Sequence, residues 1–207
     1  MDLNSLALGY SGCWTITCHN NFPKSAGIAS SASSMAALTK GCVQFIESQS
    51  NGPKLNTEEI AALSQMGSGS SCRSFFAPIA VWQNEHIFNL DCPFDLVHFV
   101  VLFDASEKKV SSSMAHQKVS RSPLLMDRIT RANSRVAILI DAFKQRDWPT
   151  IVKTSIDDSK DMHQLLESVR VKYRNHETDT FFKDLKTFLI HQPMDILTTM
   201  DAGPNIH

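Results

Sequence analysis

Residues 67–74 read Gly67-Ser68-Gly69-Ser70-Ser71-Cys72-Arg73-Ser74 and form the most informative stretch of this sequence. The two glycines free the backbone to form a nest of N–H groups that binds anions, and the serines add hydroxyl donors. Arg73 supplies a planar fork of donors that matches a carboxylate or a phosphate. A flexible surface loop with a solvated arginine could have the same composition. The density of donors favours an anion-binding loop over that alternative.

A second donor-rich stretch lies upstream, where residues 23–32 read PKSAGIASSA between a predicted strand and a predicted helix. Gly27 lets the backbone approach a ligand closely, and the start of the helix offers unpaired N–H groups at its positive end. Ser30 and Ser31 carry hydroxyls that could reach phosphate oxygens or a metal ion. The stretch lacks the lysine of a Walker A loop, so a tightly packed helix rich in Ala and Ser is the alternative.

Two further motifs are weaker when taken singly. Asp201-Ala202-Gly203-Pro204-Asn205 predicts a turn directly after a strand, and composition alone favours an Asx-turn for its aspartate. Residues 110–117 (VSSSMAHQ) suggest a helix N-terminus that presents Ser111 or Ser112.

Periodicity and turn residues predict a mixed α+β chain with a joint near Cys92-Pro93. A capping box formed by Asn56 and Glu59 predicts a short helix, and Asp147 with Pro149 marks the start of another. Residues 67–71 are too rich in Gly and Ser for regular structure, whereas Cys72–Phe76 could turn helically. The predicted strands are Gly12–His19, Ile79–Trp82, Leu96–Phe103 (buried) and Asp195–Met200, and the predicted helices are Ile28–Ile46, Pro123–Arg146, Pro149–Tyr173 and Asp179–His191.

Composition excludes several classes of protein, but it says little about the chemistry of this one. The 207 residues carry a formal net charge of -1, so a broad basic face for nucleic acid or for an anionic membrane is not expected. No apolar run approaches the ~20 residues of a membrane span. The five cysteines include no C-x-x-C pair and predict reduced thiols in a cytoplasmic protein. The eight histidines lack zinc-site spacing.

The four motifs together, in this order, resemble a known family. Residues 20–32 resemble the phosphate loop of the GHMP kinase superfamily, which includes galacto-, homoserine- and mevalonate kinases. Residues 67–74 are similar to the signature of mevalonate diphosphate decarboxylases, usually written G-S-G-S-A-C-R-S, with Ser71 replacing Ala. The pair Ser111-Ser112, the stretch 158–163 and residues 200–205 match the same family in the same order.

The resemblance implies an α+β, GHMP-kinase-like two-part fold. Residues 1–93 would form part of the N-terminal ATP- and phosphate-binding domain, and residues 94–207 part of the substrate-side domain. The implied reaction converts mevalonate diphosphate and ATP to isopentenyl diphosphate, ADP, phosphate and carbon dioxide, in isoprenoid biosynthesis. It implies ATP and Mg²⁺ as cofactors, a small-molecule substrate, and a homodimer. Such phosphoryl chemistry depends mainly on positioning and charge stabilisation, which donor-rich loops supply.

The resemblance also implies roles for individual residues. Asp201 would lie beside the 3-hydroxyl of the substrate as general base or orienting group, and Arg73 would hold the substrate carboxylate. The other implied contacts are Ser68, Ser70 and Ser112 for the substrate, Lys24, Gly27, Ala29, Ser30 and Ser31 for the ATP phosphates, and Ser31 as a candidate neighbour of Mg²⁺.

Departures from the family pattern limit what is expected of this chain. Lys24 stands where members often have a small polar residue. Members begin with a segment such as A-N-x-A-x-x-K-Y-W-G-K, which supplies a lysine and a tyrosine to the catalytic site, and they continue beyond the position of Asn205. We therefore expect a fold that is incomplete at both ends, unpaired strand edges, and weak or no catalysis.

Two alternatives remain open at this point. One is a GHMP-type small-molecule kinase that phosphorylates without decarboxylation, although the presence of both Arg73 and Asp201 favours decarboxylation. The other is a non-catalytic remnant that binds a nucleotide or a partner chain only.

Overall fold

The computed structural model describes residues 15–22, 28–49, 54–103, 110, 112–192 and 194–207. Contacts along the chain divide it into two compact units, of which the first comprises residues 1–22 and 30–90 and the second residues 23–29 and 91–207. The candidate phosphate residues Lys24 and Gly27 lie outside the described residues. In the part of the chain that is described, no helix is long and apolar enough to cross a membrane.

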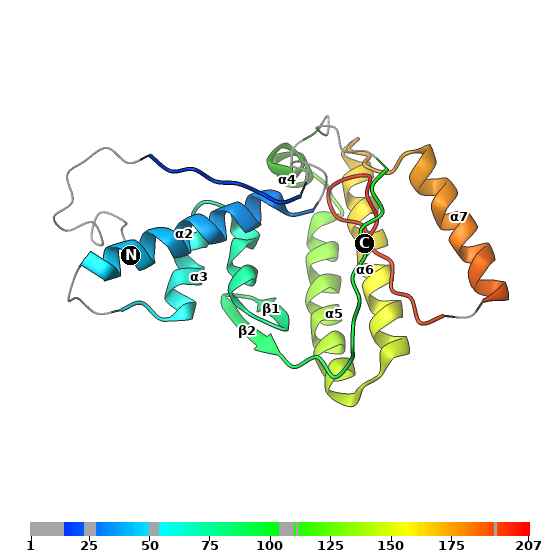
Figure 1. Cartoon of the computed structure of the whole chain (residues 1–207). Coiled ribbons are helices and arrows are strands. Elements are labelled where there is room, and N and C mark those ends of the chain that lie inside the picture. The colour runs from blue at the N-terminus through cyan, green and yellow to red at the C-terminus, as the bar shows by residue number, and fades with distance from the viewer. Residues whose placement is uncertain (1–14, 23–27, 50–53, 104–109, 111, 193) are drawn as a thin grey trace. The chain divides into compact units, whose positions relative to one another are not determined.

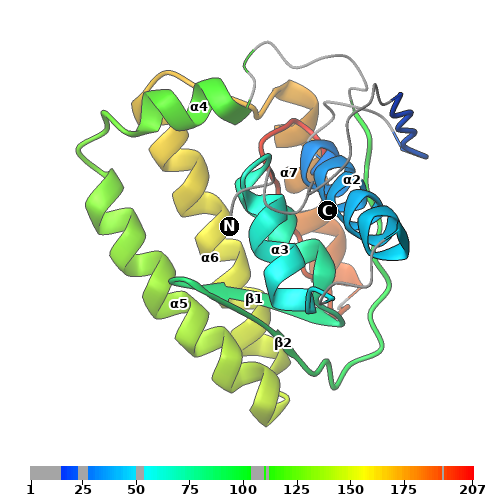
Figure 2. The same cartoon turned by 90° about the vertical axis from the view of Figure 1, so that its left-hand side faces the viewer.

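Helices α2 (Ser30–Gln49) and α3 (Thr57–Gln65) and the 3₁₀ helix η1 (Gly69–Phe75) pack together in the first unit (Figure 2). The predicted capping box is confirmed at the start of α3. Asn56 Oδ1 accepts from the N–H of Glu59 at 2.9 Å, and Glu59 Oε2 accepts from the N–H of Asn56 at 2.8 Å. The cap matters for function because α3 leads directly into residues 67–74.

An antiparallel hairpin completes the first unit. Strand β1 (Ile79–Gln83) pairs with β2 (His86–Leu90), and Gln83 faces His86 across a two-residue turn. Asn84 in that turn has φ 55°, a left-handed conformation that asparagine tolerates better than most residues. The first strand was predicted from its apolar residues, whereas β2 was not.

The second unit is helical. It contains α4 (Ser112–Val119), α5 (Leu125–Gln145), α6 (Trp148–Ser168) and α7 (His176–His191). Helices α5 and α6 lie side by side (Figure 1). The predicted start of α6 is confirmed, since Asp147 Oδ1 accepts from the N–H of Thr150 at 3.1 Å and Pro149 occupies the first turn.

Helix α6 ends at Ser168, five residues before the predicted end. Arg170 adopts a left-handed φ of 59°, the N–H of Val171 bonds to the carbonyl of Leu166, and the N–H of Arg170 bonds to that of Glu167. This is a Schellman end, with Val171 packed on Leu166 in the core. Glycine usually occupies this left-handed position. Because Arg170 occupies it here, nothing in the sequence indicated that α6 ends at Ser168.

Three of the predicted strands are wrong in the residues that the structure describes. Residues 15–19, 96–103 and 195–200 have no strand ladder. Val101 and Met200 form isolated bridges with Ile206 only. Residues 96–103 were predicted to be buried, yet Val97 is 78% exposed and Phe99 73% exposed. A strand needs a neighbour along its whole length, and period-2 composition cannot show whether one is present.

Candidate functional site

Residues 67–74 begin as the continuation of α3. The N–H groups of Gly67 and Ser68 both donate to the carbonyl of Ser64, at 3.1 and 3.2 Å. From Gly69 the chain turns into the 3₁₀ helix η1, so the prediction of irregular structure over 67–71 is wrong for its second half, and the predicted helical turn at Cys72–Phe76 is confirmed as part of η1. The donor-rich segment is therefore an ordered turn on a helix end.

Two buried hydroxyls lie beneath this turn. Ser64 and Ser71 are both 0% exposed, and their Oγ atoms are 2.7 Å apart. Ser64 donates to the carbonyl of Ala61 at 2.8 Å, and Ser71 Oγ also lies 2.7 Å from the carbonyl oxygen of Ser68. The hydroxyl that distinguishes Ser71 from the alanine of the family signature is thus satisfied internally rather than offered to a ligand.

The side chains expected to bind substrate lie on the outside of the turn. Arg73 is exposed, and within the described residues no carboxylate lies within ion-pair distance of its guanidinium. Ser68 and Ser70 are half-buried. A Cβ at Gly69 would meet nothing within 4 Å. The turn therefore presents a cation and hydroxyls toward open space.

The start of α2 lies close to this turn. A Cβ at Gly67 would overlap the side chain of Met35, which is about one helical turn, or ~6 Å of rise, beyond Ser31. Helix α2 begins at Ser30 with no acidic residue in its first turn, and Ser31 is exposed. The preceding Ala29 has a left-handed φ of 52°. The first unit thus brings together the helix start with Ser30 and Ser31 and the turn with Ser68 and Ser70.

Asp201 lies in the second unit, in a turn that is anchored on both sides. Before it, Ser159 Oγ on α6 lies 3.1 Å from the nitrogen and 3.2 Å from the oxygen of Met200. After it, Thr178 Oγ1 donates to the carbonyl of Pro204 at 3.0 Å, and Asn205 Oδ1 accepts from the N–H of Phe103 at 2.8 Å. The side chain of Asp201 itself is exposed, so a fixed backbone presents its carboxylate to solvent.

Tyr173 joins the Asp201 turn to the start of α4. It belongs to a buried cluster with Ala115, Leu166 and Val171, against which Ala202 packs. Its hydroxyl donates to the carbonyl of Val110 at 3.1 Å, close to the point where α4 begins at Ser112. Burial, followed by the negative charge of Asp201, raises the pKa of Tyr173. The helix that starts with Ser112 and the Asp201 turn therefore share one core.

His163 lies beneath the same turn. It is 6% exposed, and its Nε2 has no hydrogen-bond partner among the described residues. Burial, and then the positive charge of Arg174, lower its pKa, while Glu167, the Met200 carbonyl group and Asp201 oppose that shift. A neutral imidazole is thus held near the candidate base.

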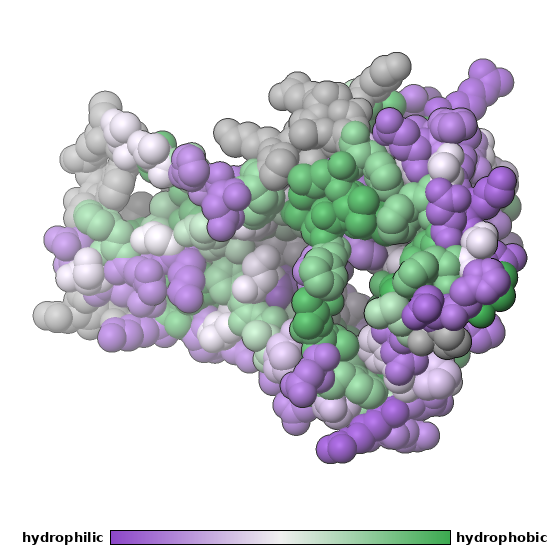
Figure 3. Space-filling view, turned by 45° about the vertical axis from the view of Figure 1, so that its right-hand side comes forward, coloured by the Kyte–Doolittle hydropathy of each residue, from purple (hydrophilic) through white to green (hydrophobic). Residues whose placement is uncertain are grey.

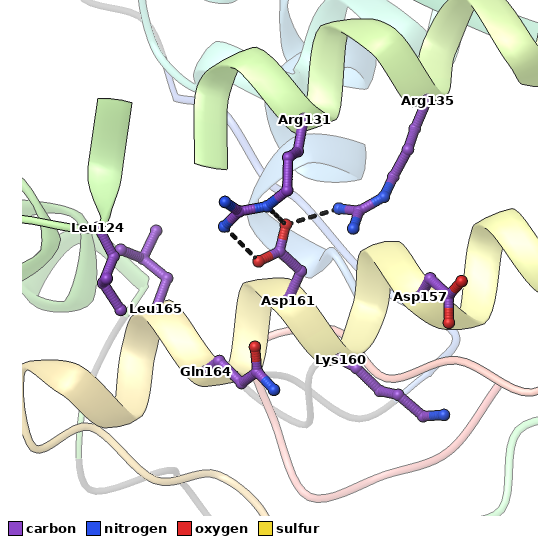
Figure 4. Close-up of a pocket in the computed structure, with 8 residues that line it drawn as sticks. All are labelled: Leu124, Arg131, Arg135, Asp157, Lys160, Asp161, Gln164 and Leu165. Atoms are coloured by element: carbon purple, nitrogen blue, oxygen red, sulfur yellow. Dashed lines mark hydrogen bonds and ion pairs between the residues drawn. The ribbon is translucent and has the colours of Figure 1, made fainter. Parts of the chain in front are cut away.

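A pocket of about 420 Å³ on the second unit lies over an ionic cluster between α5 and α6 (Figure 4). Arg131 and Arg135 reach from α5 to Asp161 on α6, with shortest N–O distances of 2.6 Å each. Arg128 bonds to Asp158 at 2.9 Å, and Arg135 lies 3.2 Å from the same carboxylate. Each of the three arginines pairs with a carboxylate of α6, although Arg128 Nη1 has no hydrogen-bond partner among the described residues. We therefore interpret the cluster as one that holds the two helices together.

The sequence-predicted site residues therefore fall into two groups, one in each unit. Arg73, Ser68, Ser70, Ser30 and Ser31 belong to the first, and Asp201 and the helix that begins at Ser112 belong to the second. Sequence reasoning did not find Tyr173, for which no local pattern exists. Ser159 and His163 fell within the stretch 158–163 that resembles the family, which was the available signal.

Two protein-family models match the chain. The model described as the diphosphomevalonate decarboxylase-like N-terminal domain matches residues 10–92, and that of the mevalonate 5-diphosphate decarboxylase C-terminal domain matches residues 98–207. A diphosphomevalonate decarboxylase of Gibberella zeae is 31% identical over 161 residues, which are 72% of this chain and 41% of the relative. The chain spans about half the length of the curated relatives that it matches.

Solved structures agree with the family models. The crystal structure of a mevalonate diphosphate decarboxylase from Legionella pneumophila is 38% identical, with a TM-score of 0.81, and the match covers 90% of this chain and 60% of that one. A structure described as "MDDEF in complex with MVAPP, AMPPCP and Magnesium" matches with a TM-score of 0.73 at 24% identity, over 89% of this chain and 58% of that one. The expected α+β, GHMP-kinase-like fold is confirmed.

Proposed function

Because this chain belongs to the diphosphomevalonate decarboxylase family, we propose that it takes part in the ATP-dependent decarboxylation of mevalonate diphosphate to isopentenyl diphosphate. The observation that carries the proposal is the ordered turn 67–73, which exposes Arg73 beside the serine-rich start of α2. Residues 1–93 then belong to the ATP- and phosphate-binding domain and residues 94–207 to the substrate-side domain. The ranges of the two family models support this division.

The start of α2 fits the phosphates of ATP. Its first turn offers backbone N–H groups and the positive end of the helix dipole, and it has no carboxylate that would repel an anion. Ser30 and Ser31 add hydroxyls, and Ala29, Lys24 and Gly27 precede them in the chain. ATP supplies the γ-phosphoryl group that makes the 3-oxygen of the substrate a leaving group.

A magnesium ion would be held at this site mainly by the phosphates of the substrates, with few protein ligands. No group of three His, Cys, Asp or Glu side chains that could hold a metal ion occurs in the described part of the chain. Mg²⁺ commonly keeps several waters and binds through substrate phosphates, so it does not need a cage of protein ligands. The exposed hydroxyl of Ser31 is the candidate protein contact.

Asp201 serves the first chemical step. Its carboxylate accepts the proton of the tertiary 3-hydroxyl, or orients that hydroxyl, as the oxygen attacks the γ-phosphorus. The anchored backbone on both sides of Asp201 supports this role, since a base must be held within hydrogen-bond distance of the proton that it removes.

Arg73 serves the second step. Its guanidinium holds the substrate carboxylate while the phosphorylated 3-oxygen leaves as phosphate, and the electrons of the bond to the carboxylate then form the new double bond as carbon dioxide departs. Ser68 and Ser70 contact the substrate with its diphosphate, and Ser112 is a further substrate contact. The absence of an ion-pair partner for Arg73 in the described residues supports a role toward a ligand.

The test of this function measures two products separately. The chain, and a longer version extended to the length of its relatives, are incubated with ATP, Mg²⁺ and mevalonate diphosphate, and ADP and carbon dioxide are quantified. Equal amounts of both products are expected from the longer version. ADP without carbon dioxide would show a kinase, and neither product from the longer version would favour a binding remnant.

Asp201→Asn is the sharpest substitution for this assay. In the longer version we expect kcat to fall by about 100-fold or more with little change in substrate binding, because the amide keeps the shape of the carboxylate but cannot accept the proton. Measurement of kcat and of substrate Kd checks this expectation. Activity that survives the substitution would show that Asp201 has another role.

A cytoplasmic location and a homodimeric state complete the proposal. The location rests on the cysteine pattern and the homodimer on the family resemblance. Sedimentation analysis of the longer version tests the homodimer.

A further inference from the structure

The hydroxyl of Ser159 on α6 contacts the backbone of Met200, the residue directly before the candidate base Asp201. Ser159 Oγ accepts from the N–H of Met200 at 3.1 Å and lies 3.2 Å from its carbonyl oxygen. A serine hydroxyl can accept and donate at the same time, so both contacts can form together. Met200 is 5% exposed, which leaves its two backbone groups little water to replace a lost partner.

His163, one turn beyond Ser159 on α6, also bonds to the Met200 backbone. The other hydrogen bonds of this turn lead away from α6. Thr199 and His207 bond to each other through their backbones, and Val101 bonds to Ile206. Thr178 holds Pro204 three residues beyond Asp201. In the described residues, two side chains of α6 therefore tie the chain immediately before Asp201 to a long helix: Ser159 contacts both backbone groups of Met200, and His163 adds a bond to its carbonyl group.

We propose that Ser159 is a positioning residue for Asp201: by holding both backbone groups of Met200, it sets where the Asp201 carboxylate points. This role rests on the proposed function, because Asp201 is taken as the base or orienting group. Ser159 touches neither the substrate nor the reacting atoms. Its loss would let the turn move on its amino-terminal side while Thr178 still holds the other side.

The activity test uses the longer version and a matched control. Ser159→Ala should lower kcat about 10- to 100-fold with KM for ATP and for mevalonate diphosphate within about threefold, since small displacements of a catalytic group cost rate rather than binding. Ser155→Ala removes the same hydroxyl one turn earlier on α6 and should leave kcat within about twofold. Ser159→Thr keeps the hydroxyl and should restore most of the lost kcat.

A double variant separates positioning from general damage. If Ser159 acts through Asp201, Ser159→Ala should lower kcat no further when Asp201→Asn is already present. A full multiplicative loss in the double variant, or equal losses from Ser159→Ala and Ser155→Ala, would overturn the proposal.

Hydrogen exchange of this chain tests the positioning without any activity. Ser159→Ala should speed exchange of the Met200 amide, which loses its acceptor, and of the Gly203 amide, which bonds to the Asp201 carbonyl at 2.8 Å. About tenfold faster exchange there, with unchanged exchange in α7, supports positioning even if the longer version releases no carbon dioxide and the proposed function fails. Unchanged exchange at both amides would overturn the proposal whatever the activity.

Discussion

The carboxylate of Asp161 lies within ion-pair distance of three arginines of α5. The hydrogen bond from Arg131, followed by that from Arg135 and the nearby charge of Arg128, holds its pKa at about 2 against an ordinary 3.8, although burial acts in the opposite direction. The side chain is 9% exposed, so solvent screens these interactions only partly. One carboxylate therefore neutralises guanidiniums that would otherwise repel one another between α5 and α6.

Asp161→Asn should lower the free energy of unfolding by about 2 kcal/mol at pH 7, the value of a pKa difference of nearly two units. A carboxyl whose pKa is depressed in the folded state stabilises above its unfolded pKa, so the deficit should shrink as pH falls from about 4 toward 2. Urea denaturation between pH 2 and 7 measures both effects. Asp157→Asn, which breaks only the exposed pair with Lys153 at 2.7 Å, is the control and should cost less than about 1 kcal/mol. Equal costs for the two variants would contradict this account.

The lowered pKa of His163 predicts a second dependence of stability on pH, near neutrality. Burial lowers its pKa below the ordinary 6.5, so between these two values the unfolded chain binds a proton that the folded chain does not. Stability should therefore be lost as pH falls below about 6.5 and level off once the folded state is also protonated. The charged groups that face it are Arg174, Glu167 and Asp201, of which the first favours and the other two oppose the neutral form.

His163→Gln should flatten the dependence of the urea midpoint on pH directly below pH 6.5, whatever its effect on stability at pH 7. His191→Gln removes an exposed histidine at the end of α7 and serves as the control. A slope that is unchanged in His163→Gln, or lost equally in both variants, would show that another group causes it.

The cap at the start of α7 is connected to the turn that carries Asp201 through Thr178. Asn175 caps α7 and receives the N–H of Thr178 at 2.9 Å, while the fully buried Thr178 hydroxyl lies 2.8 Å from Asn175 Oδ1 and donates to Pro204 at 3.0 Å. The same residue thus closes a capping box and anchors the Asp201 turn. A change that removes its hydroxyl should weaken both the helix start and the turn.

Thr178→Val should reduce the free energy of unfolding by about 1–2 kcal/mol, because the half-buried Pro204 carbonyl loses its donor while the branched shape is kept. It should also speed exchange of the Gly203, Asn205 and Ile206 amides. Thr187→Val, in the exposed part of α7 where the hydroxyl bonds only to the Lys183 carbonyl at 3.1 Å, is the matched control and should change stability by less than about 0.5 kcal/mol. Similar losses in both variants would indicate a helix-propensity effect instead.

Exposed apolar surface is the main liability of the chain as a whole. Side chains coloured as hydrophobic are open to solvent over part of one face (Figure 3). In the extended residues 96–102 the exposed apolar side chains are Leu96, Val97, Phe99 and Leu102. An extended, apolar segment with few strand partners is a template for pairing with other chains.

Lysines at Val97 and Phe99, introduced together, should therefore raise the concentration at which the chain aggregates without lowering its stability. These two side chains are 78% and 73% exposed and point to the same side, away from His98, which stacks on His207 at 5.4 Å. Light scattering against concentration checks the aggregation, and urea denaturation checks the stability. Met126→Lys, at a 71% exposed position on α5, should have little effect. An equal gain from Met126→Lys would point to net charge as the cause.

Much of this molecule could be read from local sequence. The capping box at Asn56 and Glu59, the Asp147–Pro149 helix start and the long helices were predicted because caps and 3.6-residue periodicity act within a few residues of one another. A helix was predicted from Ile28, two residues before α2 begins at Ser30, and the order of the donor-rich motifs predicted the family. Anion binding by residues 67–74 stays a prediction. Each of these features is formed by residues that are close together in the sequence.

Other features depended on contacts between residues far apart in the chain. The predicted strands at 96–103 and 195–200 failed because pairing needs a partner segment, and the apolar residues within one segment do not show whether a partner is present. The anchoring of Asp201 by Ser159, 42 positions earlier, and the burial of Ser64 against Ser71 could not be seen as patterns. The sequence alone specifies which chemical groups the chain carries, because residue types and their order are local properties. Which of these groups meet depends on the tertiary structure, because hydrogen bonds and burial join segments that are distant in the chain.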